Sequence, residues 1–569
     1  SDKLNGIPKI LALTGTASRT VLREMVAELG IELEDDASIV KPLTFNRKEL
    51  QFSVVSLSKG GPTFGELGNL LEDLPKKLNL DEDSFFKPKG RNTNSGIIFS
   101  PHAKGPTHGL IANREKISKD ITAEIGVCAT TAPKEFEPWE WEEVKSKHAI
   151  AFKSNKEPIL IATNAFGMGV DKPNIRWTVH MGIPSSIEAF YQEAGRAGRD
   201  RKPSHCSVIY SEKDQAYTDK VLDPSNSIEQ MRELYVKRPP EDDIDRSLYF
   251  HLNAFSSVED ELKHIRDLLQ KADYCKSSKT IELAYSSNDD KSSKGVKKAD
   301  WERALTRMSY CDLIEDYTTN YSGNTFNITF AEYDFIRAKK KLVTYITKVQ
   351  PAQLKLKSAQ IDEIKSKLNQ QQPAYFCRLV IEFTYDIIER SRRRMMIESV
   401  QLARNGKTDQ QIRERLLNYL EEGANTARVG FLAEQTVLLF EDWFELTDGI
   451  SNRTEARELR GDVSRALEAY PNHSGLLLAR SISEALAGDG DATVIKTNIK
   501  AAIEEGMSKY AKNENEINEL FLSLLKRSNE GLVEIVEPLL EIVLETLEDG
   551  YMVLDKQLAE LLVLVSEGW

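Results

Sequence analysis

The first 222 residues alternate between short apolar runs and amphipathic stretches, and this alternation limits the fold more than any other feature of the sequence. The apolar runs are too short for buried helices and are bounded by Gly, Pro and polar residues, which is typical of strands buried on both faces. They are KILALT (9–14), GIIFS (96–100), PILIAT (158–163), RWTVHM (176–181) and CSVIYS (206–211). Strands that alternate with helices pair in parallel, so the sequence predicts an α/β lobe around a mostly parallel sheet.

Composition and cysteine content exclude several classes of protein. Hydrophobic residues make up 40% of the chain and charged residues 29%, an ordinary globular mixture that excludes wholesale disorder. No apolar run approaches the ~20 residues of a membrane span, so we expect no membrane partner. The five cysteines include no C-x-x-C pair, which excludes a disulfide scaffold and zinc-knuckle spacing and favours a reducing, cytoplasmic location.

The net charge of −13 is unevenly distributed along the chain. Residues 416–569 carry 29 acidic and 13 basic side chains, whereas residues 346–415 carry 8 and 14. The acidity therefore lies in the C-terminal quarter, and the remainder is neutral to mildly basic, which leaves room for local phosphate-binding surfaces. The acidic tail suits a protein partner better than DNA.

The pattern changes after residue 222. Predicted helices connected by long polar segments replace the alternation of short apolar runs and amphipathic stretches. Residues 301–330 have apolar residues at helical spacing and then a hairpin pattern, with the turn at 322–324. Phe326, Ile328 and Phe330 alternate on one face of the second strand. A helix followed by a hairpin is the local signature of a winged helix.

Two motifs resemble motifs V and VI of superfamily-two helicases: FGMGVDKPNIR (166–176) and QEAGRAGRD (192–200). Their sequences are similar to those of the RecQ family of DNA helicases. Four further segments resemble the same family over roughly residues 1–340. They are LALTGTAS (11–18) for motif III, FNRKEL (45–50) for the segment between lobes, GIIFSPH (96–102) for motif IV and WERALTRMSYCDLIEDY (301–317) for the winged helix.

From the pattern and the resemblance we expect an α/β RecA-like helicase lobe with a parallel sheet, followed by a winged-helix domain and an all-α C-terminal region. The predicted divisions are residues 1–47 (remnant of a first RecA-like lobe), 48–222 (second lobe, motifs IV–VI), 223–345 (helical linker and winged helix), 346–415 (basic helical segment) and 416–569 (acidic helical interaction domain). Residues 466–486 look like one tetratricopeptide-type helix pair, but no repeat of roughly 34 residues is sustained.

The GRAGR sequence places Arg196 and Arg199 three residues apart, and we expect both on one helical face with Gln192. Guanidinium groups stabilise the charge that spreads over a transferred γ-phosphoryl group, and they are not deprotonated. Arginines so placed act as arginine fingers, and the resemblance implies that Gln192 relays the state of the γ-phosphate. The alternative is a basic, solvent-exposed helix end.

In motif V, Thr163 ends a predicted strand, and the glycines up to Gly169 permit a tight turn before Asp171. The resemblance implies that Thr163 binds a nucleic-acid phosphate, while Gly169 and Asp171 face the nucleotide. A loop that touches both ligands couples hydrolysis to strand movement. A plain strand-to-helix turn is the alternative.

Two shorter segments are weaker candidates. Thr14, Gly15 and Thr16 resemble a relay that couples the two lobes, although a Thr-Gly-Thr turn alone is equally consistent with an ordinary turn. Ser100 and His102 end the motif IV strand and are candidates for binding DNA phosphate. A loop histidine without that role is equally compatible with the sequence.

Aromatic and basic residues of the later segments suggest further DNA contacts. Tyr321, beside the hairpin turn, is placed to stack on an exposed base, or else it packs across the strands. Arg390, Arg392, Arg393 and Arg394 end an apolar helix. They either contact DNA phosphates or form a solvated face, and we favour the solvated face.

Two parts of a complete helicase motor are missing from this sequence: a glycine-rich loop ending in Gly-Lys-Ser/Thr and a D-E-x-H strand. Gly406-Lys407-Thr408 is rejected because it joins two predicted helices. We therefore expect a fragment that lacks most of the first lobe, where the principal ligands of ATP and Mg²⁺ reside, and that is inactive alone. The cysteines are too scattered for the zinc site of the family, so no zinc and no other metal ligands are expected.

The resemblance implies that the intact protein is an ATP-dependent DNA helicase that couples ATP hydrolysis to 3′–5′ translocation and duplex unwinding. Its expected partners are single-stranded and duplex DNA, with a protein partner at the acidic tail. The alternatives are a superfamily-two RNA helicase and a non-catalytic adaptor with a decayed motor.

Overall fold

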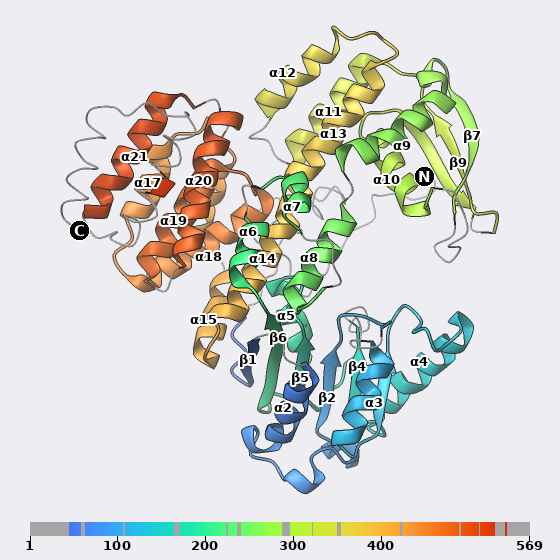
Figure 1. Cartoon of the computed structure of the whole chain (residues 1–569), viewed down its shortest axis with the longest axis vertical. Helices are drawn as coiled ribbons and strands as arrows, with labels where there is room; N and C mark the ends of the chain where they lie inside the picture. Colours follow the sequence, from blue (N-terminus) through green and yellow to red (C-terminus); the bar gives the residue numbers. More distant parts are fainter. Residues whose placement is uncertain are drawn as a thin grey trace, which may run out of the picture. The chain divides into compact units, whose positions relative to one another are not determined.

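A computed structural model describes the chain in two compact units (Figure 1). The described residues are 45–58, 63–105, 109–163, 171–223, 226–235, 240–255, 257–286, 296–320, 322–349, 354–420, 425–435, 437–488, 491–510, 512–529 and 541–542. Unit 1 takes its residues from Ser1–Leu222, Val236–His251 and Met395–Glu422, and unit 2 takes Asp223–Tyr235, Leu252–Arg394 and Gly423–Trp569. Both units are discontinuous in sequence, whereas the predicted divisions were linear.

Unit 1 is built on a six-stranded sheet in the order β1-β6-β5-β2-β4-β3, and every neighbouring pair is parallel. The strands are β1 (Leu50–Ser58), β2 (Ser95–Phe99), β3 (Ile125–Cys128), β4 (Ile159–Ala162), β5 (Ile175–Met181) and β6 (Ser204–Glu212). Four of the five predicted strands are thereby confirmed, and residues 9–14 lie outside the described part. The predicted parallel α/β lobe is confirmed.

Helices cover both faces of this sheet, which explains why its strands are continuous apolar runs. The helices are α2 (Thr63–Lys77), α3 (Leu110–Asp120), α4 (Pro138–Lys153), α5 (Ile187–Ala194) and α6 (Gln215–Val221). One core contains Leu71, Ile117 and Trp141 from α2, α3 and α4. The opposite core contains Phe52 of β1 and Phe190 of α5.

A helix from much later in the chain completes the second core. Helix α15 (Asp409–Leu420) packs Ile412 and Leu416 against this face. Asp409 accepts a hydrogen bond of 2.6 Å from the backbone nitrogen of Phe52, which caps a free donor on the edge strand β1. Arg413 donates to the carbonyl oxygens of Arg47 (3.0 Å) and Leu50.

This placement divides the predicted basic segment 346–415, because its last part belongs to unit 1. Helix α14 (Arg390–Asn405) precedes α15, and Gly406-Lys407-Thr408 joins the two helices, as expected from the sequence. No strand leads into this segment, so it does not have the strand–loop–helix geometry of a phosphate loop.

The structure contains the predicted helix and hairpin in unit 2. Strands β7 (Lys279–Ala284), β9 (Thr325–Phe330) and β8 (Ile314–Asn320) form an antiparallel sheet in that order, after helix α10 (Lys298–Ser309). Phe326, Ile328 and Phe330 are all fully buried, so the alternation predicted for the second strand is confirmed. The helix and hairpin are present, and their assignment as a winged helix stays a proposal.

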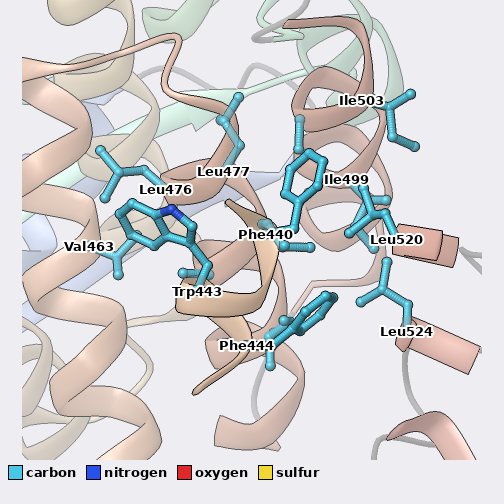
Figure 2. Close-up of a cluster of buried hydrophobic side chains, with 14 of the residues drawn as sticks. Phe440, Trp443, Phe444, Val463, Leu476, Leu477, Ile499, Ile503, Leu520 and Leu524 are labelled. Atoms are coloured by element: carbon cyan, nitrogen blue, oxygen red, sulfur yellow. The ribbon is translucent and has the colours of Figure 1, made fainter. Parts of the chain in front are cut away.

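The remaining described elements of unit 2 are helical. They are α7 (Ile228–Leu234), α9 (Val258–Lys271), α11 (Phe335–Val349), α12 (Leu354–Ile364), α13 (Gln372–Thr384), α16 (Thr426–Ala433), α17 (Phe440–Asp448), α18 (Arg453–Ala469), α19 (Ser474–Ala487), α20 (Ala492–Lys509) and α21 (Glu514–Asn529). Figure 2 shows the apolar core shared by α17 to α21, in which the indole of Trp443 lies near Leu476. Gly475 is required at this point, because a Cβ there would lie 2.1 Å from the indole nitrogen of Trp443.

Three of the four arginines at the start of α14 are enclosed with partners and Arg392 is exposed, so the solvated-face interpretation is wrong for Arg390, Arg393 and Arg394. Arg393 is 1% exposed and pairs with Glu389 at 3.1 Å. Arg390 pairs with Glu505 at 2.6 Å, and Arg394 donates to Asn498 at 2.9 Å. The start of helix α14 is packed inside unit 2. The sequence shows that these side chains are charged, but it does not show which carboxylates from other helices pair with them.

The buried side chain of His205 in β6 makes the stability of unit 1 depend on pH. Burial is the largest effect and, with Lys77 nearby, lowers the pKa of His205 to about 4, while Ser53 bonds its Nε2 at 3.0 Å. The unfolded chain binds more protons between about pH 6.5 and pH 4, so the free energy of unfolding falls as the pH decreases through this window.

We expect this histidine alone to remove about 3 kcal/mol of stability between pH 7 and pH 4. The His205→Gln variant takes up no proton there, so urea unfolding as a function of pH should show a shallower slope than the wild type. Equal slopes would contradict the buried, neutral assignment.

Candidate functional site

Three sequence-predicted residues of unit 1, Ser100, His102 and Thr163, lie at the carboxyl edge of the parallel sheet. Ser100 follows β2, Thr163 follows β4 and Gly182 follows β5, and these three strands are neighbours. In open parallel sheets ligands bind at this edge, where the loops leave the strands. The edge is therefore the candidate site of this unit.

The segment after α5 turns sharply rather than continuing as a helix. Helix α5 ends at Ala194, and Gly198 has a φ of +62°, which favours glycine. The backbone nitrogen of Gly198 donates to the carbonyl oxygen of Ile175 at 2.9 Å. Arg47 donates to the carbonyl oxygen of Ala197 at 2.9 Å, so residues of the predicted inter-lobe segment hold this turn in place.

The turn separates the two arginines that we expected on one helical face, and that expectation was wrong. Arg196 is 8% exposed, whereas the side chain of Arg199 is 37% exposed. The cause is the left-handed residue Gly198 between them, which redirects the chain. Gln192, in the last turn of α5, is exposed. Only one of the two guanidinium groups is presented to solvent.

The exposed arginine forms an ion pair with the other motif. Arg199 Nη1 lies 2.7 Å from Asp171 Oδ1, and the Asp171 side chain is 84% exposed. Because the turn bonds to Ile175, the first residue of β5, the pair lies at the amino edge of the sheet, where it joins the segment after α5 to the segment that precedes β5. In water such a pair contributes little to stability, so a competing anion can displace the carboxylate from the arginine.

The buried arginine has a different environment. Burial is the main effect and lowers the pKa of Arg196, the neighbouring Arg199 acts in the same direction, and Glu193 opposes both. The guanidinium stays charged at neutral pH. Its Nε has no hydrogen-bond partner among the described residues, while Glu193 also bonds His180 at 2.9 Å.

Ser100 and His102 shape the loop after β2. The hydroxyl of Ser100 donates to the carbonyl oxygen of His102 at 3.2 Å and accepts from Asn113 at 3.0 Å. His102 is half-buried, and its ring lies 4.8 Å from that of Phe250. Burial, and the charge of Arg246 after it, lower the pKa of His102, so this imidazole is neutral at pH 7.

Sequence reasoning missed helix α8 (Asp243–Ala254), whose first residues attach to the same edge. Asp243 accepts hydrogen bonds of 2.8 Å from both the backbone nitrogen and the hydroxyl of Ser211, at the end of β6. It also pairs with Arg246 at 2.6 Å. Burial raises the pKa of the adjacent Asp242, which accepts from the backbone nitrogen of Lys213 at 2.8 Å. The acidic run before an apolar helix is a helix-start signal that was available in the sequence.

Comparison with known proteins relates this geometry to one family. Residues 142–201 match the helicase conserved C-terminal domain. The chain is 31% identical over 223 residues to the ATP-dependent DNA helicase hus2/rqh1 of Schizosaccharomyces pombe, a match covering 39% of this chain and 14% of that protein. It is 29% identical over 216 residues to the RecQ-like DNA helicase BLM of Xenopus laevis, covering 37% and 13%. This lobe is similar to that of RecQ-type DNA helicases.

The chain is also 29% identical over 218 residues to a putative ATP-dependent RNA helicase of Acanthamoeba polyphaga mimivirus, covering 38% of this chain and 33% of that protein. The matched segments thus span a third or less of the relatives' own lengths. Activity, substrates and partners of the whole protein are therefore taken up below as proposals.

Five predicted site residues lie outside the described part of the chain: Thr14, Gly15, Thr16, Gly169 and Tyr321. Thr163 is described, and its backbone nitrogen donates to the carbonyl oxygen of Cys128 at 3.2 Å. The roles of these residues, and of Ser100 and His102 toward phosphate, stay predictions.

The described donor groups of the turn after α5 suit an anion. Arg199 offers an exposed, planar set of donors, which matches the oxygens of a phosphate. Within the described residues no group of three or more His, Cys, Asp or Glu side chains is placed to hold a metal ion. No helix of the described part is long and apolar enough to span a bilayer.

Proposed function

We propose that this chain contributes the second motor lobe of an ATP-dependent DNA helicase, which translocates 3′ to 5′ and unwinds duplexes. The observation that carries the proposal is the exposed Arg199–Asp171 pair, which links the two motifs at the amino edge of the sheet. Arg199 then completes an ATP site whose other residues belong to a facing lobe. The match to RecQ-type DNA helicases supports DNA as the nucleic acid.

Bound Mg²⁺-ATP supplies a γ-phosphoryl group whose negative charge spreads in the transition state. In the open state Asp171 orients Arg199 by their 2.7 Å contact. When the lobes close, Arg199 exchanges this carboxylate for the phosphate oxygens. Arg196, buried under the same turn, is a positioning residue that stabilises the turn through its charge beside Glu193.

Strand movement is coupled to hydrolysis through the chain between Thr163 and Asp171. Thr163 is the proposed DNA-phosphate contact and Asp171 is the proposed nucleotide contact, so loss of the γ-phosphate shifts both. We assign Ser100 and His102 to the path of the strand, and the β8–β9 hairpin to duplex separation. The acidic helices of unit 2 are the proposed surface for a protein partner.

The second candidate is an RNA helicase, because one similar protein carries that description. A third is an adaptor that binds nucleic acid without turnover. The three differ in nucleic-acid preference and in the effect of nucleic acid on ATP hydrolysis.

We expect the purified 569-residue chain to bind single-stranded DNA and to hydrolyse no ATP above the blank, because the principal ATP ligands lie in the facing lobe. Fluorescence anisotropy with a labelled oligothymidine, a matched oligouridine and a blunt duplex measures nucleic-acid binding. Phosphate release measures ATP hydrolysis. ATP turnover by the pure chain would overturn the two-lobe assignment. A clear preference for the oligouridine would favour the RNA helicase.

A further inference from the structure

Helix α8 crosses the carboxyl edge of three adjacent strands. Its start is attached to the end of β6, because Asp243 accepts two hydrogen bonds from Ser211. Two helical turns later, Phe250 contacts His102, which follows β2. In the sheet β5 lies between β6 and β2, so α8 spans the edge along which the proposed strand path runs.

This helix presents two large aromatic side chains to solvent. Tyr249 is 42% exposed and Phe250 is 49% exposed. Their ring centroids are 5.5 Å apart with an angle of 83° between the planes, and the Phe250 ring also rests on His102 at 4.8 Å. Soluble proteins rarely expose clustered aromatic rings without a ligand to cover them.

The charges around these rings favour a polyanion over an apolar peptide. Lys104, on the loop of His102, and Lys213, after β6, are exposed cations, and Lys213 pairs with the exposed Glu241. The acidic groups Asp242 and Asp243 are buried and hydrogen-bonded, so they present little negative charge to a ligand. Aromatic rings between cations are typical of surfaces that bind single-stranded nucleic acid.

We propose that Tyr249, Phe250 and His102 form a platform on which a base of single-stranded DNA stacks. This proposal rests on the proposed function and deepens it by naming a base contact at the carboxyl edge of the second lobe. The His102 ring lies beside Phe250 with 48° between the planes, and Tyr249 packs at 83° to Phe250, so neither ring stacks in parallel on Phe250, which is 49% exposed. Stacking is tolerant of sequence, as a translocating motor requires.

The test is the affinity of the full 569-residue chain for a labelled oligothymidine, measured by anisotropy at several salt concentrations. We expect the double variant Tyr249→Ala/Phe250→Ala to bind at least about tenfold more weakly at every salt concentration. The slope of log K against log salt should stay unchanged, because stacking releases no counterions. A phosphate contact would instead reduce that slope by about one unit.

Conservative variants separate stacking from packing. Tyr249→Phe and Phe250→Trp keep a ring face and should bind like the wild type, and the new indole should change its fluorescence when the oligonucleotide binds. Phe250→Leu keeps apolar bulk without a π face and should bind weakly. Ile150→Ala, which removes an equally exposed apolar side chain at the far end of α4, is the control for surface changes and for stability.

The outcomes distinguish the platform from the helicase assignment. If the wild type binds oligothymidine and the double variant binds equally well, the platform is wrong and the proposed function stands. If the wild type binds no single strand, the proposed function falls and the platform with it. If Phe250→Leu binds as tightly as Phe250→Trp, or the salt slope drops with the loss, base stacking is excluded.

Discussion

Replacing Arg199 with alanine in the protein that carries both lobes is expected to lower ATP turnover by about 10³-fold or more. The reason is that Arg199 is the exposed guanidinium of the turn, whereas Arg196 is buried beneath it. Affinity for single-stranded DNA should change by less than about twofold, because the strand is assigned to residues at the carboxyl edge and Arg199 lies at the amino edge. Phosphate release with saturating DNA, and anisotropy without ATP, measure the two effects.

Arg201→Ala is the matched control. Arg201 lies two residues further on, its side chain is 77% exposed, and it pairs with Glu49 at 3.4 Å. This variant removes the same charge from the same turn and should leave turnover within about threefold of the wild type, the size of effect that a loose surface pair allows. If Arg201→Ala were as inactive as Arg199→Ala, or if Arg199→Ala kept its turnover, the arginine-finger assignment would be wrong.

Replacing Arg393 with methionine is expected to lower the free energy of unfolding of unit 2 by about 3–5 kcal/mol. The guanidinium is fully enclosed, pairs with Glu389 at 3.1 Å and donates to the carbonyl oxygens of Asp223 (3.1 Å) and Asn226 (2.7 Å). Methionine has similar length but leaves the Glu389 carboxylate buried without its cation. Urea unfolding followed by tryptophan fluorescence and circular dichroism measures the loss.

The neighbouring arginine provides the control. Arg392 is exposed on the same helix, with its guanidinium 5.4 Å from the ring centre of Phe255, an interaction worth about 0.5–1 kcal/mol. Arg392→Met should therefore be nearly neutral. The double variant Glu389→Leu/Arg393→Met should recover part of the lost stability, because it removes the unpaired carboxylate. Equal losses for Arg392→Met and Arg393→Met would contradict the buried pair.

Local patterns predicted the elements of this protein well. The apolar runs of unit 1 are strands because residues buried on both faces of a parallel sheet must all be apolar. The alternation of Phe326, Ile328 and Phe330 predicted one buried face of β9, since side chains alternate across a strand. In each case the signal comes from residues close in sequence, where backbone geometry sets the spacing.

The candidate site was predicted in part. The motifs placed Arg199, Asp171, Ser100 and His102 in one lobe, but spacing alone put Arg196 on the same face as Arg199. A single left-handed glycine, Gly198, separates the two side chains, and the backbone φ of a glycine is not specified by its neighbours. Base-stacking residues were not predicted at all, because Tyr249 and Phe250 lie outside every motif.

Local sequence patterns were sufficient to predict the parallel α/β lobe, the helix and hairpin of unit 2, and the similarity of the lobe to RecQ-type helicases, because these depend on short-range periodicity and on residues within one motif. The folded structure was needed to show that α15 closes the lobe from a distance in sequence, that α8 crosses the carboxyl edge, and that Arg390, Arg393 and Arg394 of α14 are enclosed. Those outcomes depend on which carboxylates and apolar faces meet across the fold, and no local spacing carries that information.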